Sequence, residues 1–308
     1  MPIYLNEKDV AEFLDMPSAI AALRDAFAAR ARQEANVVPR TRWAFEDRRL
    51  NVMGGGIANQ HRYALKAYGS SAFHVLLYSM QGLLAIIEAN VLGQIRTGAA
   101  TGVASELMAR PEGKRVALIG TGRQARTQAL ALKSVGMLSE LFVFARTTEK
   151  LEAFCTKLES ELGVRVHAAS SAEAAVAGAD IVVAATNSAT PVVMNSWVRP
   201  GTHVVGMGAN AANRREIDAE IVLRASLVVT DDIPQAKIEA GEFIDLAKAG
   251  RLDWNTVKPL HEIIAGPPLP RDPAAITVFK SLGVGLEDVA VASVIYDRAV
   301  ASGRFKPL

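Results

Sequence analysis

The chain has 308 residues, of which 50% are hydrophobic and 21% are charged, and its formal net charge is +2. This near-neutral balance, with few aromatic residues and no basic block, argues against a nucleic-acid-binding protein. A single cysteine, Cys155, excludes an intramolecular disulfide, no signal-peptide pattern opens the chain, and no apolar run reaches the roughly 18 residues that would span a bilayer. We therefore expect a globular cytoplasmic enzyme that has no membrane or nucleic-acid partner.

The first 112 residues predict a small α+β domain. A long helix is expected over residues 19–33, after Pro17 and Ser18. Four strand-like segments follow, at 50–53, 63–68, 75–78 and 83–87. A helix rich in small residues covers 93–110, and a last helix over 285–302 is expected to return to this part of the chain. We therefore assign residues 1–112 and 284–308 to one domain.

Residues 113–283 predict a second domain with a doubly wound parallel sheet of the Rossmann type. Strands are expected at 115–119, 141–145, 164–168, 181–185, 202–206 and 227–230. Helical patterns, such as those over 149–162 and 171–177, separate several of these apolar runs. This alternation is typical of parallel strands joined by crossover helices. Pro267 to Pro270 mark a late loop.

A glycine-rich turn follows the first of these strands and reads Gly120, Thr121, Gly122, Arg123, Gln124 and Ala125. Gly120 permits a tight turn, Gly122 lets the backbone approach a pyrophosphate, and Ala125 is small enough for the next helix to pack on the strand. The amides at the start of that helix favour a negative charge. Glycine-rich turns also join strands to helices for steric reasons alone, but the strand before this turn and the helix after it favour a dinucleotide site.

The end of the second strand predicts which dinucleotide binds. An NAD-specific site usually ends this strand with an acid that accepts hydrogen bonds from the ribose hydroxyls. This chain has Ala145 followed by Arg146, Thr147 and Thr148. A guanidinium beside two hydroxyls suits a phosphate dianion, so we predict a preference for NADP(H), with NAD(H) possible. The alternative is that Arg146 is a solvated residue at a strand end.

Three cations stand among apolar or small residues of the first domain: Arg40, Lys66 and Arg96. Lysine and arginine are seldom buried unless they are paired, so these residues suggest a site for a substrate carboxylate. Internal salt bridges, for example to Glu88 or Glu106, explain the pattern equally well.

Other reaction types have no signal in the sequence, which contains no metal-ligand cluster, no Ser-His-Asp motif and no Walker loop. The five histidines are scattered along the chain, and only His74 lies near the expected substrate site. A histidine in such a place is more often structural than a ligand-binding group.

These segments resemble the ornithine cyclodeaminase/mu-crystallin family over nearly the whole chain. The most specific segment runs from Ile95 to Thr101 and is followed by the glycine-rich turn. Supporting segments are Pro39-Arg40, Leu65-Lys66, residues 177–182 and residues 281–288. The resemblance implies a homodimer whose interface and substrate site come from the N-terminal domain and the last helix. It also implies that the substrate is bound by Arg40, Lys66, Arg96 and Leu282. The cofactor contacts that it implies are Thr97, Gln124, Thr186, Met207 and Ser281.

Two departures from the cyclodeaminases of this family concern the chemistry. Asn210 stands where they carry an aspartate after the fifth Rossmann strand, and Asn51 stands where they carry a glutamate. An amide cannot take up a proton at neutral pH, so Asn210 can orient an imine or amine but cannot act as a general base. Both changes count against deamination of a diamino acid, whose second ammonium group needs a negative partner.

We therefore expect an NAD(P)H-dependent oxidoreductase that acts on an α-imino or α-amino acid, such as an imine or ketimine reductase or an amino-acid dehydrogenase. Lys66 either donates the proton or only binds the carboxylate, and the sequence leaves both roles open. The first alternative is a cyclodeaminase that releases ammonia from ornithine or lysine with bound NAD. The second is a non-catalytic protein that binds NADP(H) or a small ligand.

Overall fold

A computed structural model describes residues 1–69, 71–269 and 272–305. The chain divides into two compact units, residues 1–100 with 283–308 and residues 101–282. The division falls inside helix α3 (Asn90–Met108). The expected domain bounds at residues 112 and 283 remain a prediction.

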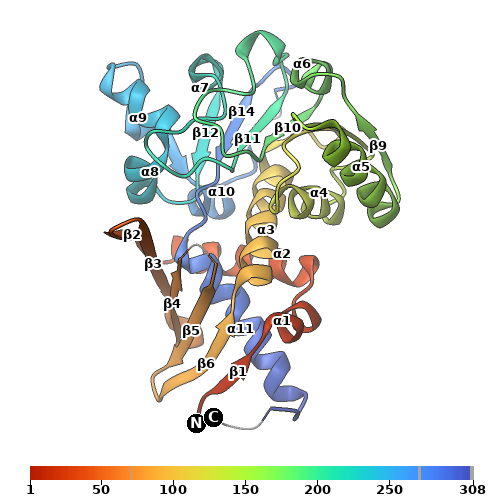
Figure 1. The fold of residues 1–308 in the computed structure, drawn as a ribbon. Helices are drawn as coiled ribbons and strands as arrows, with labels where there is room; N and C mark the ends of the chain where they lie inside the picture. The colour runs from red at the N-terminus through yellow and green to blue at the C-terminus, as the bar shows by residue number, and fades with distance from the viewer. Residues whose placement is uncertain (70, 270–271, 306–308) are drawn as a thin grey trace. The chain divides into compact units, whose positions relative to one another are not determined.

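The first unit is built on a sheet of six strands in the order β1-β6-β5-β4-β3-β2 (Figure 1). Its elements are β1 (Ile3–Leu5), α1 (Glu7–Phe13), α2 (Met16–Ala31), β2 (Ala35–Phe45), β3 (Arg48–Ile57), the 3-10 helix η1 (Ala58–Gln60), β4 (Arg62–Tyr68), β5 (Phe73–Ser79), β6 (Gly82–Glu88), the start of α3, and α11 (Gly285–Ala301). Only β1 pairs in parallel, with β6. The predicted α+β class and the return of the last helix are confirmed, whereas β1, α1 and β2 were not expected.

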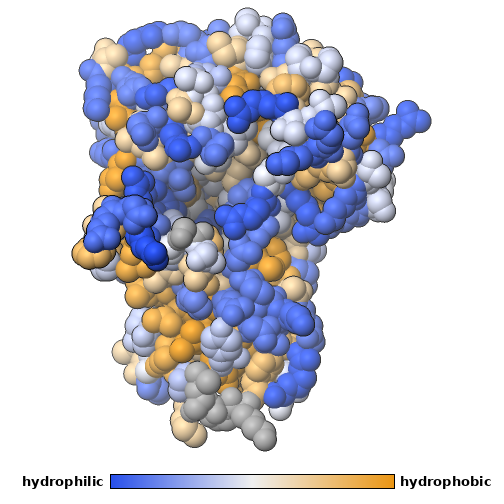
Figure 2. Space-filling view, viewed as in Figure 1, coloured by the Kyte–Doolittle hydropathy of each residue, from blue (hydrophilic) through white to orange (hydrophobic). Residues whose placement is uncertain are grey.

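The two faces of this sheet differ because side chains alternate along each strand. In β4, Ala64 and Lys66 are buried, whereas Tyr63 and Leu65 are exposed. Helices α2 and α11 pack on the buried face. The large apolar side chains that β2 to β4 expose are Val38, Trp43, Phe45, Leu50, Tyr63 and Leu65. Figure 2 shows apolar surface in the part of the molecule that Figure 1 assigns to these strands and their neighbours.

The second unit is a parallel sheet of eight strands in the order β13-β12-β14-β11-β10-β7-β8-β9. Its strands are β7 (Arg115–Ile119), β8 (Glu140–Phe144), β9 (Arg165–Ala168), β10 (Ile181–Ala184), β11 (His203–Gly206), β12 (Leu227–Thr230), β13 (Val257–Pro259) and β14 (Thr277–Lys280). Its helices are the end of α3, α4 (Ala125–Ser134), α5 (Thr148–Leu162), α6 (Ala172–Val176), α7 (Ala219–Arg224), α8 (Ile233–Glu239), α9 (Gly241–Lys248) and α10 (Leu260–Ala265), with the 3-10 helices η2 (Asn195–Trp197) and η3 (Trp254–Thr256).

All six predicted strands of this sheet are confirmed, but β13 and β14 were not expected. Strand β14 lies between β11 and β12, so the chain returns late to the middle of the sheet. Residues 267–269 lie outside helices and strands, as the proline-rich segment predicts, and Pro270 lies outside the described residues. Strand order reverses between β7 and β10, and in such sheets ligands bind at the carboxyl ends of the strands beside that point.

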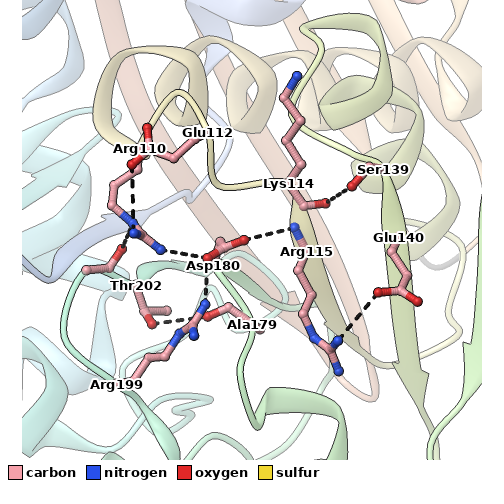
Figure 3. A network of polar contacts seen from close by, with 11 residues as sticks. Arg110, Glu112, Lys114, Arg115, Ser139, Glu140, Ala179, Asp180, Arg199 and Thr202 are labelled. Atoms are coloured by element: carbon pink, nitrogen blue, oxygen red, sulfur yellow. Dashed lines mark hydrogen bonds and ion pairs between the residues drawn. The ribbon is translucent and has the colours of Figure 1, made fainter. Parts of the chain in front are cut away.

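A network of hydrogen bonds and ion pairs joins residues at the opposite, amino edge of the same sheet (Figure 3). Asp180, which precedes β10, accepts hydrogen bonds from the Arg110 and Arg199 guanidinium groups, both at 2.6 Å, and from the Arg115 backbone N–H at 3.1 Å. Arg115 begins β7 and also pairs with Glu140 at 3.4 Å. Asp180 therefore joins the segment after α3 to the starts of β7 and β10, and the family-like segment 177–182 stabilises the scaffold at this point.

Candidate functional site

The glycine-rich turn has the geometry that a dinucleotide needs. Gly120 has φ +112°, and an added Cβ there would lie 2.5 Å from the Ala185 carbonyl oxygen. Gly122 is exposed, and nothing lies within 4 Å of the position its Cβ would take. Ala125 begins α4 and is fully buried. The turn is therefore tight on the sheet side and open on the other side, where a pyrophosphate approaches in this type of fold.

The start of α4 leaves polar groups available for such a ligand. Gln124 occupies the N-cap position, but its side chain makes no capping hydrogen bond. Its buried Oε1 atom has no hydrogen-bond partner among the described residues. A helix N-terminus without a side-chain cap favours an anion, so the residues of this turn fit the phosphates of a dinucleotide.

The residues expected to select the cofactor lie at the end of β8. Arg146 is exposed and forms no hydrogen bond or ion pair with another described residue. Thr147 is the N-cap of α5, and its hydroxyl does not cap that helix. A free guanidinium and an uncapped helix N-terminus thus lie side by side in the chain, where a ribose phosphate would be expected.

Four more predicted site residues follow the carboxyl ends of neighbouring strands. Thr186 comes after β10, Met207 and Asn210 after β11, and Ser281 after β14. These strands are adjacent and parallel to one another, so the four residues share one edge of the sheet with the glycine-rich turn. Met207 and Ser281 are buried, whereas Thr186 and Asn210 are partly exposed.

The other predicted residues that bind substrate or cofactor are Leu282, which ends the second unit, and Thr97, which lies on α3 in the first unit. The backbone N–H of Leu282 donates to the Asp231 carboxylate. The Thr97 hydroxyl donates to the Gly93 carbonyl oxygen at 2.7 Å.

The first unit brings Arg40, Lys66 and Arg96, here called the cation cluster, into one buried group. Lys66 Nζ lies 2.8 Å from Asp288 Oδ1, and Arg96 contacts both Glu287 (2.8 Å) and Asp288 (3.2 Å). Each of these five residues is at most 6% exposed. The group therefore brings three cations and two carboxylates together away from solvent.

The charges in this group shift one another's pKa values. Burial lowers the pKa of Lys66 to about 8, although Asp288 beside it acts in the opposite direction. Burial alone would raise the pKa of Asp288, but Arg96 and Lys66 hold that pKa below its usual range. Arg96 stays charged because Asp288 and Glu287 raise its pKa against the effect of burial. The two opposite charges of Asp288 and Arg96 therefore stabilise each other in the buried group.

A glycine fixes the place of the Arg96 guanidinium. Gly283 has φ +69°, and an added Cβ there would lie 2.1 Å from Arg96 Nη1. The carbonyl oxygen of Gly283 accepts a hydrogen bond from Arg40 Nη2 at 2.7 Å. Because Gly283 has no side chain, it leaves room for the Arg96 guanidinium, and its carbonyl oxygen binds Arg40.

The cations do form internal salt bridges, as the alternative interpretation predicts, but Glu88, one of the two partners suggested for them, binds elsewhere. Glu88 instead accepts from the Tyr4 hydroxyl at 2.6 Å and from the Glu7 backbone N–H at 2.8 Å. The partners are Glu287 and Asp288, which open α11. Two adjacent acids followed by a run of apolar residues are the signal that could have identified them, because buried acids need cationic partners. His74 points to the sheet face opposite Lys66, in register with Ala67, and this favours its structural role.

The described residues offer no metal centre and no membrane span. Between residues 1 and 305, outside positions 70, 270 and 271, no group of three or more His, Cys, Asp or Glu side chains is placed to hold a metal ion. No helix in the described part of the chain is long and apolar enough to cross a membrane.

Comparison with known families adds to this geometry. The model of the ornithine cyclodeaminase/mu-crystallin family matches residues 2–303. The chain belongs to this family. The resemblance carried by the Ile95–Thr101 segment and the glycine-rich turn is thereby confirmed.

Solved structures of three family relatives have the same fold. The Thermococcus litoralis Delta(1)-pyrroline-2-carboxylate reductase, in complex with NADH and L-proline, aligns with a TM-score of 0.94 at 28% identity and covers 99% of this chain and 100% of its own. An archaeal alanine dehydrogenase dimer with bound NAD gives 0.92 at 29% identity, covering 100% and 98%. The Paracoccus denitrificans iminosuccinate reductase with NAD+ gives 0.92 at 28% identity, covering 99% and 98%.

Proposed function

We propose that this protein is an NAD(P)H-dependent oxidoreductase that reduces the C=N bond of an α-imino acid to give an α-amino acid. The observation that carries the proposal is the cation cluster, in which two arginines and a lysine lie buried together in a member of this family. A substrate carboxylate is the anion that such a group of cations binds through charge-assisted hydrogen bonds. The relatives named above act on a cyclic imino acid, on alanine and on iminosuccinate, and all three compounds carry an α-carboxylate.

Each residue of the cluster has a role in this reaction. Arg40 and Arg96 bind the carboxylate through charge-assisted hydrogen bonds, which hold the imine carbon in one place. The glycine-rich turn would hold the pyrophosphate of a reduced dinucleotide, which would supply the hydride for that carbon when bound. Lys66 holds a proton at Nζ, and its lowered pKa of about 8 suits both carboxylate binding and proton donation to the imine nitrogen.

Asn210 supports reduction over cyclodeamination. It follows β11 at the sheet edge expected to hold the nicotinamide, and its amide can orient a nitrogen but cannot accept a proton. Reduction of an imine that arrives already formed needs no base at this position. Removal of ammonia from ornithine or lysine does need proton transfer on an amine, so cyclodeamination is the second candidate.

We assign the cofactor as NADP(H) in preference to NAD(H), on the basis of Arg146 and Thr147. Arg146→Asp should weaken NADPH binding by at least about 2 kcal/mol, because it replaces a charge-assisted contact with a repulsive one. NADH binding should change less or improve. Arg165→Asp is a matched control, since Arg165 is also exposed but begins β9 at the amino edge of the sheet. Equal losses for NADPH and NADH in Arg146→Asp, measured by titration calorimetry, would contradict the assignment.

We also propose that the protein works as a homodimer and that it acts in the cytoplasm, as the sequence predicts. The outer face of the first unit's sheet exposes large apolar side chains on β2, β3 and β4, and Phe45 is 76% exposed. An exposed apolar patch marks an interaction site more often than other parts of a protein surface do. A second copy of the chain is the occupant that the dimeric alanine dehydrogenase suggests. Analytical ultracentrifugation of the wild type and of Phe45→Glu tests this assembly.

The decisive experiment is a substrate screen followed at the nicotinamide absorbance. Cyclic and linear α-imino acids should consume NADPH stoichiometrically, and ornithine and lysine should release no ammonia. Ammonia release without net change in the nicotinamide would establish the cyclodeaminase alternative. Binding of the dinucleotide without turnover of any compound in the screen would favour the non-catalytic alternative.

A further inference from the structure

Glu216 accepts hydrogen bonds from two separate turns of the second unit. Its Oε1 atom accepts from the Thr186 backbone N–H at 2.6 Å and from the Thr186 hydroxyl at 2.8 Å. Its Oε2 atom accepts from the backbone N–H groups of Gly208 at 2.5 Å and Ala209 at 2.8 Å. Glu216 is fully buried, and each oxygen is satisfied by two donors from a different turn.

Two further buried charged residues, Glu242 and Lys280, hold the backbone of Glu216 in place. Its backbone N–H donates to Glu242 Oε1 at 2.8 Å, and Glu242 pairs with Lys280 Nζ at 3.1 Å. Glu242 is 1% exposed and Lys280 is fully buried. Lys280 ends β14, beside Gly206 of β11, so the network reaches from the two turns to a strand of the sheet. Such a network allows little adjustment, because any broken contact leaves a buried polar group unpaired.

The two turns touch each other at Gly208. An added Cβ there would lie 2.0 Å from the Thr186 carbonyl oxygen and 2.7 Å from Glu216 Oε1. Thr186 follows β10, whereas Met207, Gly208 and Asn210 follow β11. These turns carry Thr186 and Met207, assigned above to the cofactor, and Asn210, assigned above to the sheet edge expected to hold the nicotinamide. Glu216 accepts hydrogen bonds from both turns.

We propose that Glu216 is a positioning residue for the nicotinamide half of the cofactor: it holds the turns after β10 and β11 in their binding arrangement before any ligand arrives. The inference rests on the proposed function for the identity of the ligand. The ADP half of the dinucleotide is served by other residues, namely the glycine-rich turn and Arg146. Loss of Glu216 should therefore affect the two halves of the cofactor unequally.

Glu216→Gln tests this with little change of shape. An amide has one acceptor oxygen and one NH2 group, so whichever way it turns, one pair of donors faces an NH2 group and loses its acceptor. We expect NADPH binding to weaken by about tenfold or more, the effect of losing a hydrogen bond to a charged acceptor. Binding of 2′-phospho-ADP, which lacks both the nicotinamide and the ribose that carries it, should weaken by less than about twofold. If the wild type prefers NADH, then NADH and ADP are the matching pair.

Asp180→Asn is the matched control, because Asp180 also accepts from three donors but lies at the amino edge of the same sheet (Figure 3). It should lower the melting temperature while leaving the affinities for both ligands unchanged. Equal weakening of NADPH and 2′-phospho-ADP in Glu216→Gln, or no weakening of either, would overturn the inference. If the wild type binds no dinucleotide, the proposed function fails instead.

Hydrogen exchange of the wild type tests the same inference without a variant. The backbone N–H groups of Gly208 and Ala209 should exchange slowly in the absence of any ligand, because they are bonded to Glu216. Fast exchange that slows only when the dinucleotide binds would show that the turns are ordered by the ligand, and the inference would then be wrong. This measurement remains decisive if Glu216→Gln does not fold.

Discussion

Asp288→Asn is the substitution that examines the buried charge balance most directly. Asp288 lies 2.8 Å from Lys66 Nζ and 3.2 Å from Arg96 Nε, and it is 1% exposed. The isosteric amide keeps the shape of the side chain but removes its charge. Lys66 and Arg96 would then lose a negative charge that both contact.

The loss of stability can be estimated from these two distances. At an effective dielectric constant of about 20, unit charges 2.8 Å and 3.2 Å apart attract by about 6 and about 5 kcal/mol. The desolvation of Asp288 offsets much of this attraction, so the net loss should be about 3–5 kcal/mol, as for other buried pairs that lose one partner. Urea unfolding at neutral pH measures it.

The same substitution should move the pH dependence of the reaction. In the wild type, kcat/KM should fall as the pH rises through about 8, because Lys66 loses its proton there and both of its possible roles need the charged form. Asp288 raises the pKa of Lys66, so in Asp288→Asn the fall should begin at lower pH. An unfolding free energy equal to that of the wild type, together with an unchanged pH profile, would refute this account of the cluster.

Three further substitutions test neighbouring parts of the site. Arg96→Lys keeps the charge but loses the planar fork, so the substrate KM should rise by about tenfold or more; an unchanged KM would place the carboxylate elsewhere. Gly283→Ala should raise KM and should destabilise the protein by more than the roughly 1–2 kcal/mol of left-handed backbone strain, because the added Cβ collides with Arg96. Gly303→Ala is the control: Gly303 has φ +67° and no atom within 4 Å of the added Cβ, so this variant should lose only the stability that the strain costs. Asn210→Asp should fold normally and introduce slow ammonia release from ornithine; no release would show that a carboxylate at this position is insufficient.

The sequence predicted the sheet of the second unit well because periodicity and glycine chemistry are local signals. Six apolar runs separated by helices, and a turn with Gly120 and Gly122, required no knowledge of distant contacts. Strand β14 was missed because it is only four residues long and holds just two apolar residues, Val278 and Phe279, between polar ends. Short buried strands of this kind carry no alternation to recognise.

Residues that act through distant partners were harder to predict. Lys66 and Arg96 were identified as buried cations, but their partners lie about two hundred residues later in the chain, and spacing says nothing about such pairs. Glu216 stands in a charged segment beside Arg214 and Arg215, where an acid is expected to be solvated. Its burial follows from the packing of two turns against each other, which composition does not encode.

The order of the two units along the chain has a consequence for synthesis. The second unit is one continuous segment, whereas the first unit consists of residues 1–100 and 283–308. A ribosome therefore completes every strand of the nucleotide-binding sheet before it releases α11, which covers the inner face of the first sheet and carries Glu287 and Asp288. Until then Lys66 and Arg96 have no acidic partners from that helix. Folding during translation should thus proceed from the middle of the chain outward, and the first unit should become protease-resistant only after the last helix has left the exit tunnel.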